Sequence, residues 1–357
     1  MYKRIVVKVG SAVITRKQSV NHKVLSNLVA QIAKLHTEGV EIVLVSSGAV
    51  ATGKGLLTID NSAHEIVQKQ AYSAVGQIAL MTHYAELFSA HTLTCAQVLA
   101  TKEDFRDRQH YFNMRNCLQN LLHSGVIPIM NENDVIAVSE LIFTDNDELA
   151  GLVASQLNAD ALVLLTSIDG VLNGDPDDPT SSVVPVIDVD TDVDIDVDSY
   201  VHTKRSATGR GGMHTKLRIA KKLARTGIAT HIANGMHANT LEDIMHNIPT
   251  GTFFPPKKKL SSVKRRIAHS EQTVRGTLMV NTCTEQLLRT KSIISILPIG
   301  VVQITGSFEK GDVLEIQTQN KTHLGYGITQ YDSTTATALC GKKNEKPLIH
   351  YDYLYIG

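Results

Sequence analysis

A chain of 357 residues is longer than the single hydrophobic cores that stop growing near about 250–300 residues, so two domains are expected. Its 35 basic and 35 acidic residues balance, which excludes a protein whose main task is to coat nucleic acid or an anionic membrane. The four cysteines lie far apart in sequence, which predicts reduced thiols and a cytoplasmic location. The longest apolar runs, such as 161–165, are too short to span a membrane, and an immediate first strand leaves no room for a targeting segment.

The first two thirds of the chain alternate apolar runs with amphipathic segments. Helical spacing, with Leu25, Leu28, Ile32 and Leu35 on one face, predicts a helix over 20–38 that ends before a glycine. Such alternation, with strands apolar on both faces, predicts an α/β domain whose mainly parallel sheet is covered by helices. The expected strands are 4–10, 41–50, 125–134, 161–170 and, as the last of them, 228–235, and the further expected helices are 68–89, 147–159 and 213–227.

The pattern changes after about residue 250, where a proline pair is followed by a basic run. We expect a first domain over 1–255, a linker over 256–273, and a small β-rich, barrel-like domain over 274–357, where short strands are separated by turns. A calcium-binding loop that began at Asp190, in the acidic stretch 184–199, would need glycine at position 195 and glutamate at position 201. The chain has Ile195 and Val201 there, so that interpretation fails. A strand or flap with one wet acidic face is the simpler interpretation.

Polar or small residues follow the predicted strands, and a glycine-rich loop opens the last helix of the first domain. Because the carboxyl ends of parallel strands meet at one edge of a sheet, we expect these loops to lie together and bind a ligand there. The loops are Lys8–Ser11, 46–49, 131–134, 144–147, Thr166–Ser167 and 209–216.

The glycine-rich loop 209–216 would point backbone N–H groups and the positive end of a helix at an anion. Lys8 and Lys216 would add two mobile positive charges, which suits phosphoryl transfer, a reaction that depends on positioning and charge stabilisation. The stretch 48–55 almost matches a P-loop but ends in glycine, so it offers no hydroxyl for magnesium. Ser47 and Gly48 are better interpreted as a small-residue platform beneath a substrate.

Structural roles remain open for several of these residues. Lys8 could be a surface lysine at the sheet edge, and Asp134 and Asp147 could serve only as helix N-caps. Asn146 could sustain a turn. Lys216 could be a solvated lysine, but a lysine is unfavourable near a helix N-terminus, so an anion that compensates it is expected there.

Taken together, these motifs resemble the amino acid kinase family. The opening VVKVGSAVIT, the turn IVLVSSGAVATG and the segment LVLLTSIDGVLNGDP are similar to family segments, as is the loop GRGGMHTKLRIA. The pair IPIMNENDVIA and FTDNDELAGLVA resembles the glutamate-specific branch, and the tail, with GSFEKGDVLEI and GYGITQYDS, resembles a PUA domain. The resemblance covers nearly the whole chain and implies a three-layer α/β/α sandwich.

The resemblance also implies an activity: Mg²⁺-dependent transfer of a phosphoryl group from ATP to the 5-carboxylate of L-glutamate, giving glutamate 5-phosphate and ADP on the way to proline. It assigns phosphoryl stabilisation to Lys8 and Lys216, which Asp147 would orient, and gives no protein metal ligand. The residues it assigns to glutamate are Ser47, Gly48, Asn131, Asp134 and Asn146. Those it assigns to ATP are Lys8, Gly10, Ser11, Thr166, Ser167, Arg210, Gly211, Gly212, Met213, His214, Thr215 and Lys216.

The chain departs from the family pattern in its nucleotide loops. Ser167 stands where the family usually has aspartate, with Asp169 nearby as a substitute, and Arg210 replaces a usual threonine. The resemblance further implies a homo-oligomer, commonly a dimer or tetramer, and feedback inhibition by proline.

Two other functions compete with this one. A relative of the same fold could phosphorylate another carboxylate, a carbamate or a nucleotide. A protein of a different class could bind RNA through the PUA-like tail and the basic run 257–266. The tail shows no evident aromatic surface for stacking bases, and a basic run is usually a solvated linker, so RNA binding is not expected as the main role.

Overall fold

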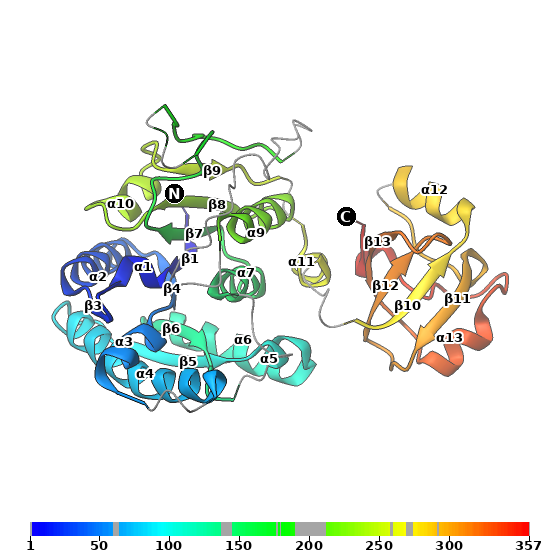
Figure 1. Cartoon of the computed structure of the whole chain (residues 1–357). Coiled ribbons are helices and arrows are strands. Elements are labelled where there is room, and N and C mark those ends of the chain that lie inside the picture. The colour runs from blue at the N-terminus through cyan, green and yellow to red at the C-terminus, as the bar shows by residue number, and fades with distance from the viewer. Residues whose placement is uncertain are drawn as a thin grey trace. The chain divides into compact units, whose positions relative to one another are not determined.

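Figure 1 shows the fold of the chain in a computed structural model. The chain divides into two compact units, Met1–Lys259 and Leu260–Gly357. This division falls inside the segment predicted as a linker, and the exact domain boundaries stay a prediction. The structure describes residues 2–59, 64–136, 145–175, 178, 180–189, 212–257, 260–268, 274–290 and 293–356.

The first unit contains a seven-stranded sheet in the order β5-β6-β4-β1-β7-β8-β9. Neighbouring strands are parallel except β8 and β9, which confirms the predicted mainly parallel sheet. The expectation that 228–235 forms the last strand was wrong, because the three-residue β9 follows it, too short to leave a sequence pattern. The strands are β1 Arg4–Val9, β4 Glu41–Ser46, β5 Cys95–Ala100, β6 Ile127–Glu132, β7 Ala161–Thr166, β8 Ala229–Asn234 and β9 Thr252–Phe254.

Helices cover both faces of this sheet (Figure 1). α2, α4 and α10 pack on one face and α5, α6, α7 and α9 on the other, which confirms the α/β/α sandwich. The predicted apolar face of 20–38 is buried in the first of these layers. The helices are α1 Ser11–Ile14, α2 His22–Thr37, α3 Ala49–Leu56, α4 Glu65–Ser89, α5 Lys102–Arg106, α6 Arg108–His123, α7 Asn146–Gln156, α9 Met213–Arg225 and α10 Thr240–Met245, and a hairpin joins β2 Thr15–Arg16 to β3 Ser19–Val20.

Alternation along β1 decides where its lysine points. Ile5, Val7 and Val9 enter the core beneath α2 and α4, whereas Val6 enters the core beneath α7 and α9. Since successive side chains of a strand point to opposite faces, Lys8 shares the face of Val6. The side chain of Lys8, the last but one residue of β1, therefore points toward the layer that contains α7 and α9.

Two glycines bring α3 and α4 into close contact. A Cβ at Gly53 would lie 1.9 Å from the carbonyl oxygen of Tyr72, and one at Gly76 would lie 1.8 Å from that of Ala49. Two glycines of the P-loop-like stretch therefore have structural roles at α3: Gly48, with φ 107°, caps the helix, and Gly53 allows the close approach of α4. This packing fixes α4 beside the edge of the sheet that carries the predicted loops.

The second unit contains a separate five-stranded sheet in the order β11-β10-β12-β13-β14, which confirms the small β-rich domain. Leu278, Ile316 and Ile349 are fully buried in its core. α11 lies in the segment predicted as a linker, and its Ile267 packs with Val313 of the sheet. The elements are α11 Ser262–Ala268, β10 Val274–Val280, α12 Thr282–Thr290, η1 Pro298–Gly300, β11 Val301–Gly306, β12 Val313–Gln317, β13 His323–Ile328, α13 Ser333–Leu339, η2 Tyr351–Tyr353 and β14 Leu354–Ile356.

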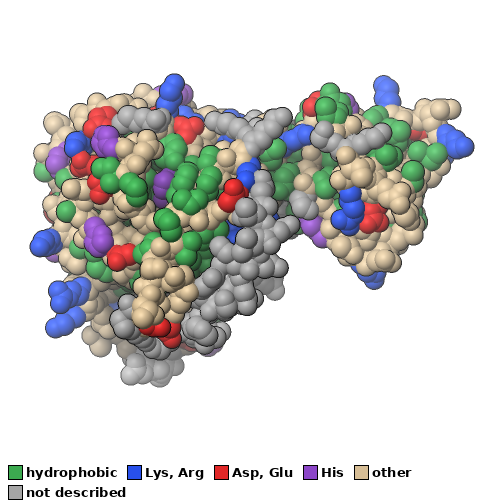
Figure 2. All heavy atoms as spheres, turned by 90° about the horizontal axis from the view of Figure 1, so that it is seen from above, with side chains coloured by type: hydrophobic (Ala, Val, Ile, Leu, Met, Phe, Trp, Pro, Cys, Tyr) green, Lys and Arg blue, Asp and Glu red, His purple; other side chains and the backbone are tan. Residues whose placement is uncertain are grey.

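The surface agrees with the balanced charge of the sequence. In the face shown in Figure 2, basic, acidic and histidine side chains are scattered among hydrophobic ones, without a broad field of one sign. Among the described helices, none combines the length and the apolar character that crossing a membrane requires.

His231 on β8 makes the first unit sensitive to acid. Burial lowers the pKa of this imidazole from 6.5 to about 4, and its Nε2 lies 3.0 Å from the hydroxyl of Tyr2. Because the folded pKa lies below the unfolded one, the neutral ring contributes stability that is complete above pH 6.5 and is lost as the pH falls toward 4. The size of this contribution is about 2–3 kcal/mol.

Replacing His231 by glutamine, which can still pair with Tyr2, is therefore expected to reduce the loss of stability between pH 7 and pH 4.5. Urea unfolding at the two pH values measures it, with the exposed His237→Gln as the control. Parallel losses in the wild type and in both variants would contradict the assignment.

Candidate active site

The carboxyl ends of β1, β4, β6 and β7 lie at one edge of the first sheet, as the parallel register requires. Gly10 follows β1 and donates its backbone N–H to the carbonyl of Leu165 at the end of β7, 3.2 Å away. α7 begins at the same edge, where Asn146 approaches the backbone after β4. The predicted loops therefore meet, as far as the described residues cover them.

Asp147 joins the two predicted lysines. Its Oδ1 lies 2.7 Å from Nζ of Lys8 and its Oδ2 lies 2.8 Å from Nζ of Lys216. All three side chains are buried, with 0% exposure for Asp147. Burial opposes ionisation of Asp147, but the two ammonium groups outweigh that effect and hold its pKa below the ordinary value. Asp147 thus holds two positively charged groups in one fixed cluster.

Different elements deliver the members of this cluster. Lys8 comes from a buried strand, Asp147 from the first turn of α7, and Lys216 from the first turn of α9. An aspartate in a first turn is favourable for the helix, whereas a lysine there is not. The ion pair with Asp147 places Lys216 where the helix dipole alone would disfavour it.

Asp145 is a site residue that the sequence analysis did not single out. It is the N-cap of α7, since its Oδ1 accepts the backbone N–H groups of Asp147 at 2.9 Å and Glu148 at 3.1 Å. Its Oδ2 is buried and has no hydrogen-bond partner among the described residues. Burial and, secondly, the charge of Asp147 raise the pKa of Asp145 to about 6, although Lys8 and Lys216 oppose the shift.

Because the pKa of Asp145 is raised, its ionisation in the folded chain lowers the free energy of unfolding. The folded chain holds this proton between pH 3.8 and about 6 while the unfolded chain releases it, so stability is lost as the pH rises through that window. Asp145→Asn keeps the cap and removes the charge. It is expected to stabilise the chain by up to about 3 kcal/mol at pH 8 and by less than about 1 kcal/mol at pH 4, measured by urea unfolding. An equal difference at both pH values would contradict this explanation.

Asn146 links the loop after β4 to the end of β6. Its Nδ2 donates to Oγ of Ser47 at 2.9 Å and to Oδ1 of Asn131 at 2.8 Å. Asn131 is buried and donates its own Nδ2 to Gln77 on α4, 2.9 Å away. The described bonds of the Asn131 side chain all go to protein groups, so as a direct substrate contact it stays a prediction. Its position supports Asn146 instead.

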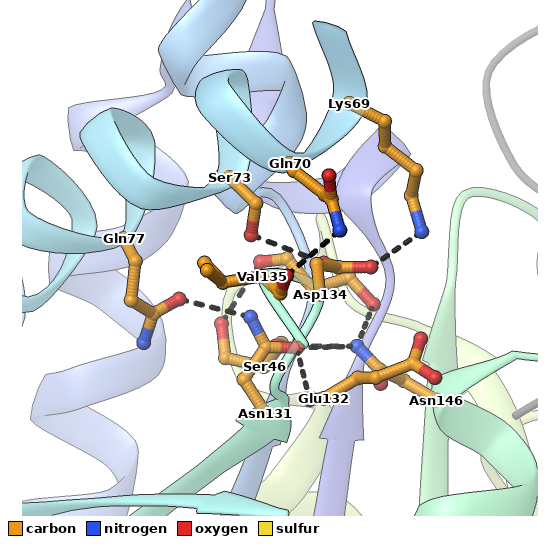
Figure 3. Close-up of polar contacts among 11 residues, drawn as sticks. Ser46, Lys69, Gln70, Ser73, Gln77, Asn131, Glu132, Asp134, Val135 and Asn146 are labelled. Carbon is orange, nitrogen blue, oxygen red and sulfur yellow. Dashed lines mark hydrogen bonds and ion pairs between the residues drawn. The ribbon is translucent and has the colours of Figure 1, made fainter. Parts of the chain in front are cut away.

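Asp134 lies against α4, as Figure 3 shows. Lys69 forms an ion pair with its Oδ1, and Ser73 donates to its Oδ2 at 3.1 Å. Gln70, one turn before Ser73, donates to the backbone carbonyl of Val135 at 2.8 Å. The spacing of Lys69, Ser73 and Gln77 places them on one face of a helix, but their spacing alone gave no signal of which loop they would contact.

The predicted nucleotide residues after β7 lie on the other side of β1 from the loop after β4. Thr166 ends β7, and Ser167 follows it on the surface. Asp169, considered as a substitute for the aspartate usual at 167, accepts a hydrogen bond from Asn234 at 2.8 Å. Gly212 is the N-cap of α9 and adopts an extended conformation, which other residues could also adopt. Ser11 begins α1, and Met213, His214 and Thr215 form the first turn of α9, whereas Thr144, Arg210 and Gly211 lie outside the described residues.

The arrangement can hold a polyanion and a small zwitterion close together. The cluster around Asp147 supplies positive charge, and the carboxylate of Asp134 supplies a partner for an ammonium group. Between them, the turn at Ser47 and Gly48 can offer a donor for an oxygen atom, whereas the N–H groups of the Asn146 amide already donate to Ser47 and Asn131.

Family models match both units. The amino acid kinase family matches residues 3–234, and the PUA domain matches residues 276–351. Both resemblances inferred from the motifs are thereby confirmed.

Whole-chain relatives carry a common name. The glutamate 5-kinase of Bacteroides thetaiotaomicron is 45% identical over 99% of each chain, and that of Chlorobaculum tepidum is 42% identical over 100% of this chain and 98% of its own. Among solved structures, carbamate kinase from Giardia lamblia bound to AMP-PNP has a TM-score of 0.52 at 17% identity, covering 71% of this chain and 99% of that one. The likeness to that structure concerns the fold alone.

Proposed function

The chain belongs to the amino acid kinase family, and from this premise we propose that it transfers the γ-phosphoryl group of ATP to the 5-carboxylate of L-glutamate. The products are ADP and glutamate 5-phosphate, and the reaction is the first step of proline biosynthesis. The observation that carries the proposal is the pair of buried lysines held on one carboxylate, Asp147. The full-length similarity to glutamate 5-kinases supports the choice of acceptor.

The nucleophile needs no general base in this reaction. A glutamate side chain has an ordinary pKa near about 4.3 and is ionised at neutral pH. Its oxygen forms a bond to the γ-phosphorus while the bond from that phosphorus to the β–γ bridging oxygen breaks, and ADP leaves with the electron pair. The barrier is the approach of one anion to another, together with the charge on the transferring group.

Lys8 and Lys216 act on that barrier. Their ammonium groups would contact the oxygens of the transferring group, where a water-poor site strengthens charge interactions. Asp147 holds both nitrogens in place and offsets their mutual repulsion. With both of its oxygens bound to lysine, Asp147 serves as a positioning residue.

At the glutamate end, Asp134 would bind the α-ammonium group. The hydroxyl of Ser47 suits a carboxylate oxygen, and Asn146 would bind one by exchanging its hydrogen bond to Ser47 or to Asn131. Gly48 adopts a left-handed conformation, and a Cβ there would lie 3.2 Å from Ile14, so the platform beneath the substrate requires glycine.

ATP would lie over Gly10, Ser11, Thr166 and Ser167, with its phosphates at the loop Arg210–Lys216. Mg²⁺ would be bound mainly by phosphate oxygens. Across the residues that the structure describes, no group of three or more His, Cys, Asp or Glu could hold a metal ion. When bound, Mg²⁺ supplies further neutralisation of phosphate charge.

The remaining expectations form part of the proposal. We propose a cytoplasmic homo-oligomer, a dimer or tetramer, that proline inhibits by feedback. Binding of RNA by the second unit is proposed only as an accessory role, because the match to a PUA domain is its main support.

Trapping the acyl phosphate tests the function directly. Glutamate, Mg-ATP and hydroxylamine should give glutamyl hydroxamate in proportion to the ADP released. Aspartate, N-acetylglutamate and UMP serve as alternative acceptors, and turnover with one of them in place of glutamate would overturn the proposal.

A further inference from the structure

Lys69 lies at the glutamate end of the site, and nothing above gives it a role. Its ammonium group forms an ion pair with Asp134, the proposed partner of the substrate ammonium (Figure 3). The Asp134 side chain is 9% exposed and that of Lys69 is 28% exposed. Lys69 is therefore the more exposed partner of the pair.

The position of Lys69 is built into the fold. Ser73, one turn further along α4, donates to the other oxygen of Asp134, and Gln77 holds Asn131. α4 itself is fixed against α3 through Gly76. Three consecutive turns of one helix face thus contact the end of β6 and the loop after it, and Lys69 is the charged residue of these three.

The contacts leave room for a ligand on both partners. A carboxylate has about four acceptor positions, and α4 uses one on each oxygen of Asp134. An ammonium group has three N–H donors, and Asp134 is the partner of Lys69 in the described ion pairs and hydrogen bonds. A substrate ammonium can therefore join Asp134 without displacing Lys69.

The two charged groups of an α-amino acid explain why a cation is needed beside Asp134. The α-carboxylate and the α-ammonium share one carbon, so a substrate whose ammonium contacts Asp134 brings a second negative charge within a few ångströms of it. The two negative charges repel each other at that separation, and a cation between them or beside them offsets the repulsion. Lys69 is the cation that contacts Asp134.

We propose, on the basis of the function above, that Lys69 binds the α-carboxylate of the substrate, so that Asp134 and Lys69 together recognise the zwitterionic head of an α-amino acid. The pair makes Lys69 a specificity-determining residue. It favours an acceptor that carries both charges over one that carries the amine alone.

Lys69→Met, which keeps the length of the side chain and removes its charge, tests the proposal. 4-Aminobutanoate serves as the probe, because it retains the ammonium and the reacting carboxylate of glutamate but lacks the α-carboxylate. Affinities for glutamate and 4-aminobutanoate are measured by calorimetry and by inhibition of glutamate turnover. Lys54→Met on the neighbouring α3 is the control, since Lys54 lies over the ring of Tyr72 and is exposed.

The expected result is a loss of glutamate affinity of about 10- to 100-fold, with the affinity for 4-aminobutanoate and the KM for ATP changed less than about threefold. Lys69→Arg should restore much of the loss. Equal losses for both ligands would overturn the proposal and make Lys69 a support for Asp134, and tighter binding of glutamate would overturn it by showing competition. If the wild type binds glutamate without phosphorylating it, the proposed function fails while the binding comparison still decides the role of Lys69.

Discussion

Asp147→Asn is expected to lower kcat by about 10²- to 10⁴-fold while the KM for glutamate changes little. Asparagine has nearly the shape of aspartate but no charge, so the ammonium groups of Lys8 and Lys216 would face each other without a shared counter-ion. One of them would move away from the other, and the transferring phosphoryl group would lose that contact. Steady-state hydroxamate formation at saturating glutamate and Mg-ATP measures the effect.

Folding must be separated from catalysis in this experiment, because leaving buried charges without a partner costs about 3–5 kcal/mol. Far-ultraviolet circular dichroism and urea unfolding establish that the variant is folded under assay conditions. Glu86→Gln, which neutralises an exposed carboxylate on α4, is the matched control and should leave kcat unchanged. A folded Asp147→Asn enzyme with kcat within about threefold of the wild type would exclude the proposed role of the cluster.

The second large effect is expected at the other end of the substrate. Asp134→Asn should raise the KM for glutamate by about 10- to 100-fold, since a hydrogen bond to a charged group contributes about 1.5–3 kcal/mol. The KM for ATP should stay the same, because the nucleotide residues lie beyond the β1 end. Initial rates with each substrate varied in turn measure both constants.

Asp352→Asn in the second unit, which neutralises an exposed carboxylate, is the control for this measurement. If Asp134→Asn raised both KM values together, or lowered kcat alone, Asp134 would be a structural residue of the loop after β6 and its role as ammonium partner would be refuted.

Much of the sheet was predictable because its strands are buried on both faces. β1, β4, β6, β7 and β8 are buried along almost their whole length, and their parallel order brings the residues that follow them to one edge. The meeting of Lys8 and Lys216 follows from that order together with the position of Lys216 in the first turn of a helix.

Other elements left weaker signals. β5 is an edge strand whose residues alternate between partly buried and exposed, and β9 has three residues. α11 overlaps the basic run 257–266, which gave no helical signal, and its Ile267 is buried by packing with Val313 and Tyr326. Such elements are fixed by tertiary contacts that a local pattern does not contain.

Within the site, the sequence did not show which residues from distant parts of the chain contact one another. Asp145 could be recognised as a candidate cap, but its buried Oδ2 and raised pKa depend on the surroundings that the fold provides. Lys69 lies 65 residues before Asp134, and the two meet because the fold packs α4 against the loop after β6. The spacing of four residues between Lys69, Ser73 and Gln77 is typical of one helix face, but it does not identify the loop that this face contacts.

The central claim is that Lys8 and Lys216 stabilise charge that develops during phosphoryl transfer. Affinity for ADP with aluminium fluoride and glutamate, which mimics the transferring group, should therefore fall by at least about 10²-fold in Lys8→Met and in Lys216→Met. Affinity for AMP-PNP, which resembles the ground state, should fall by less than about tenfold. Equal losses for the two ligands would contradict the claim and reduce the lysines to general binders of phosphate.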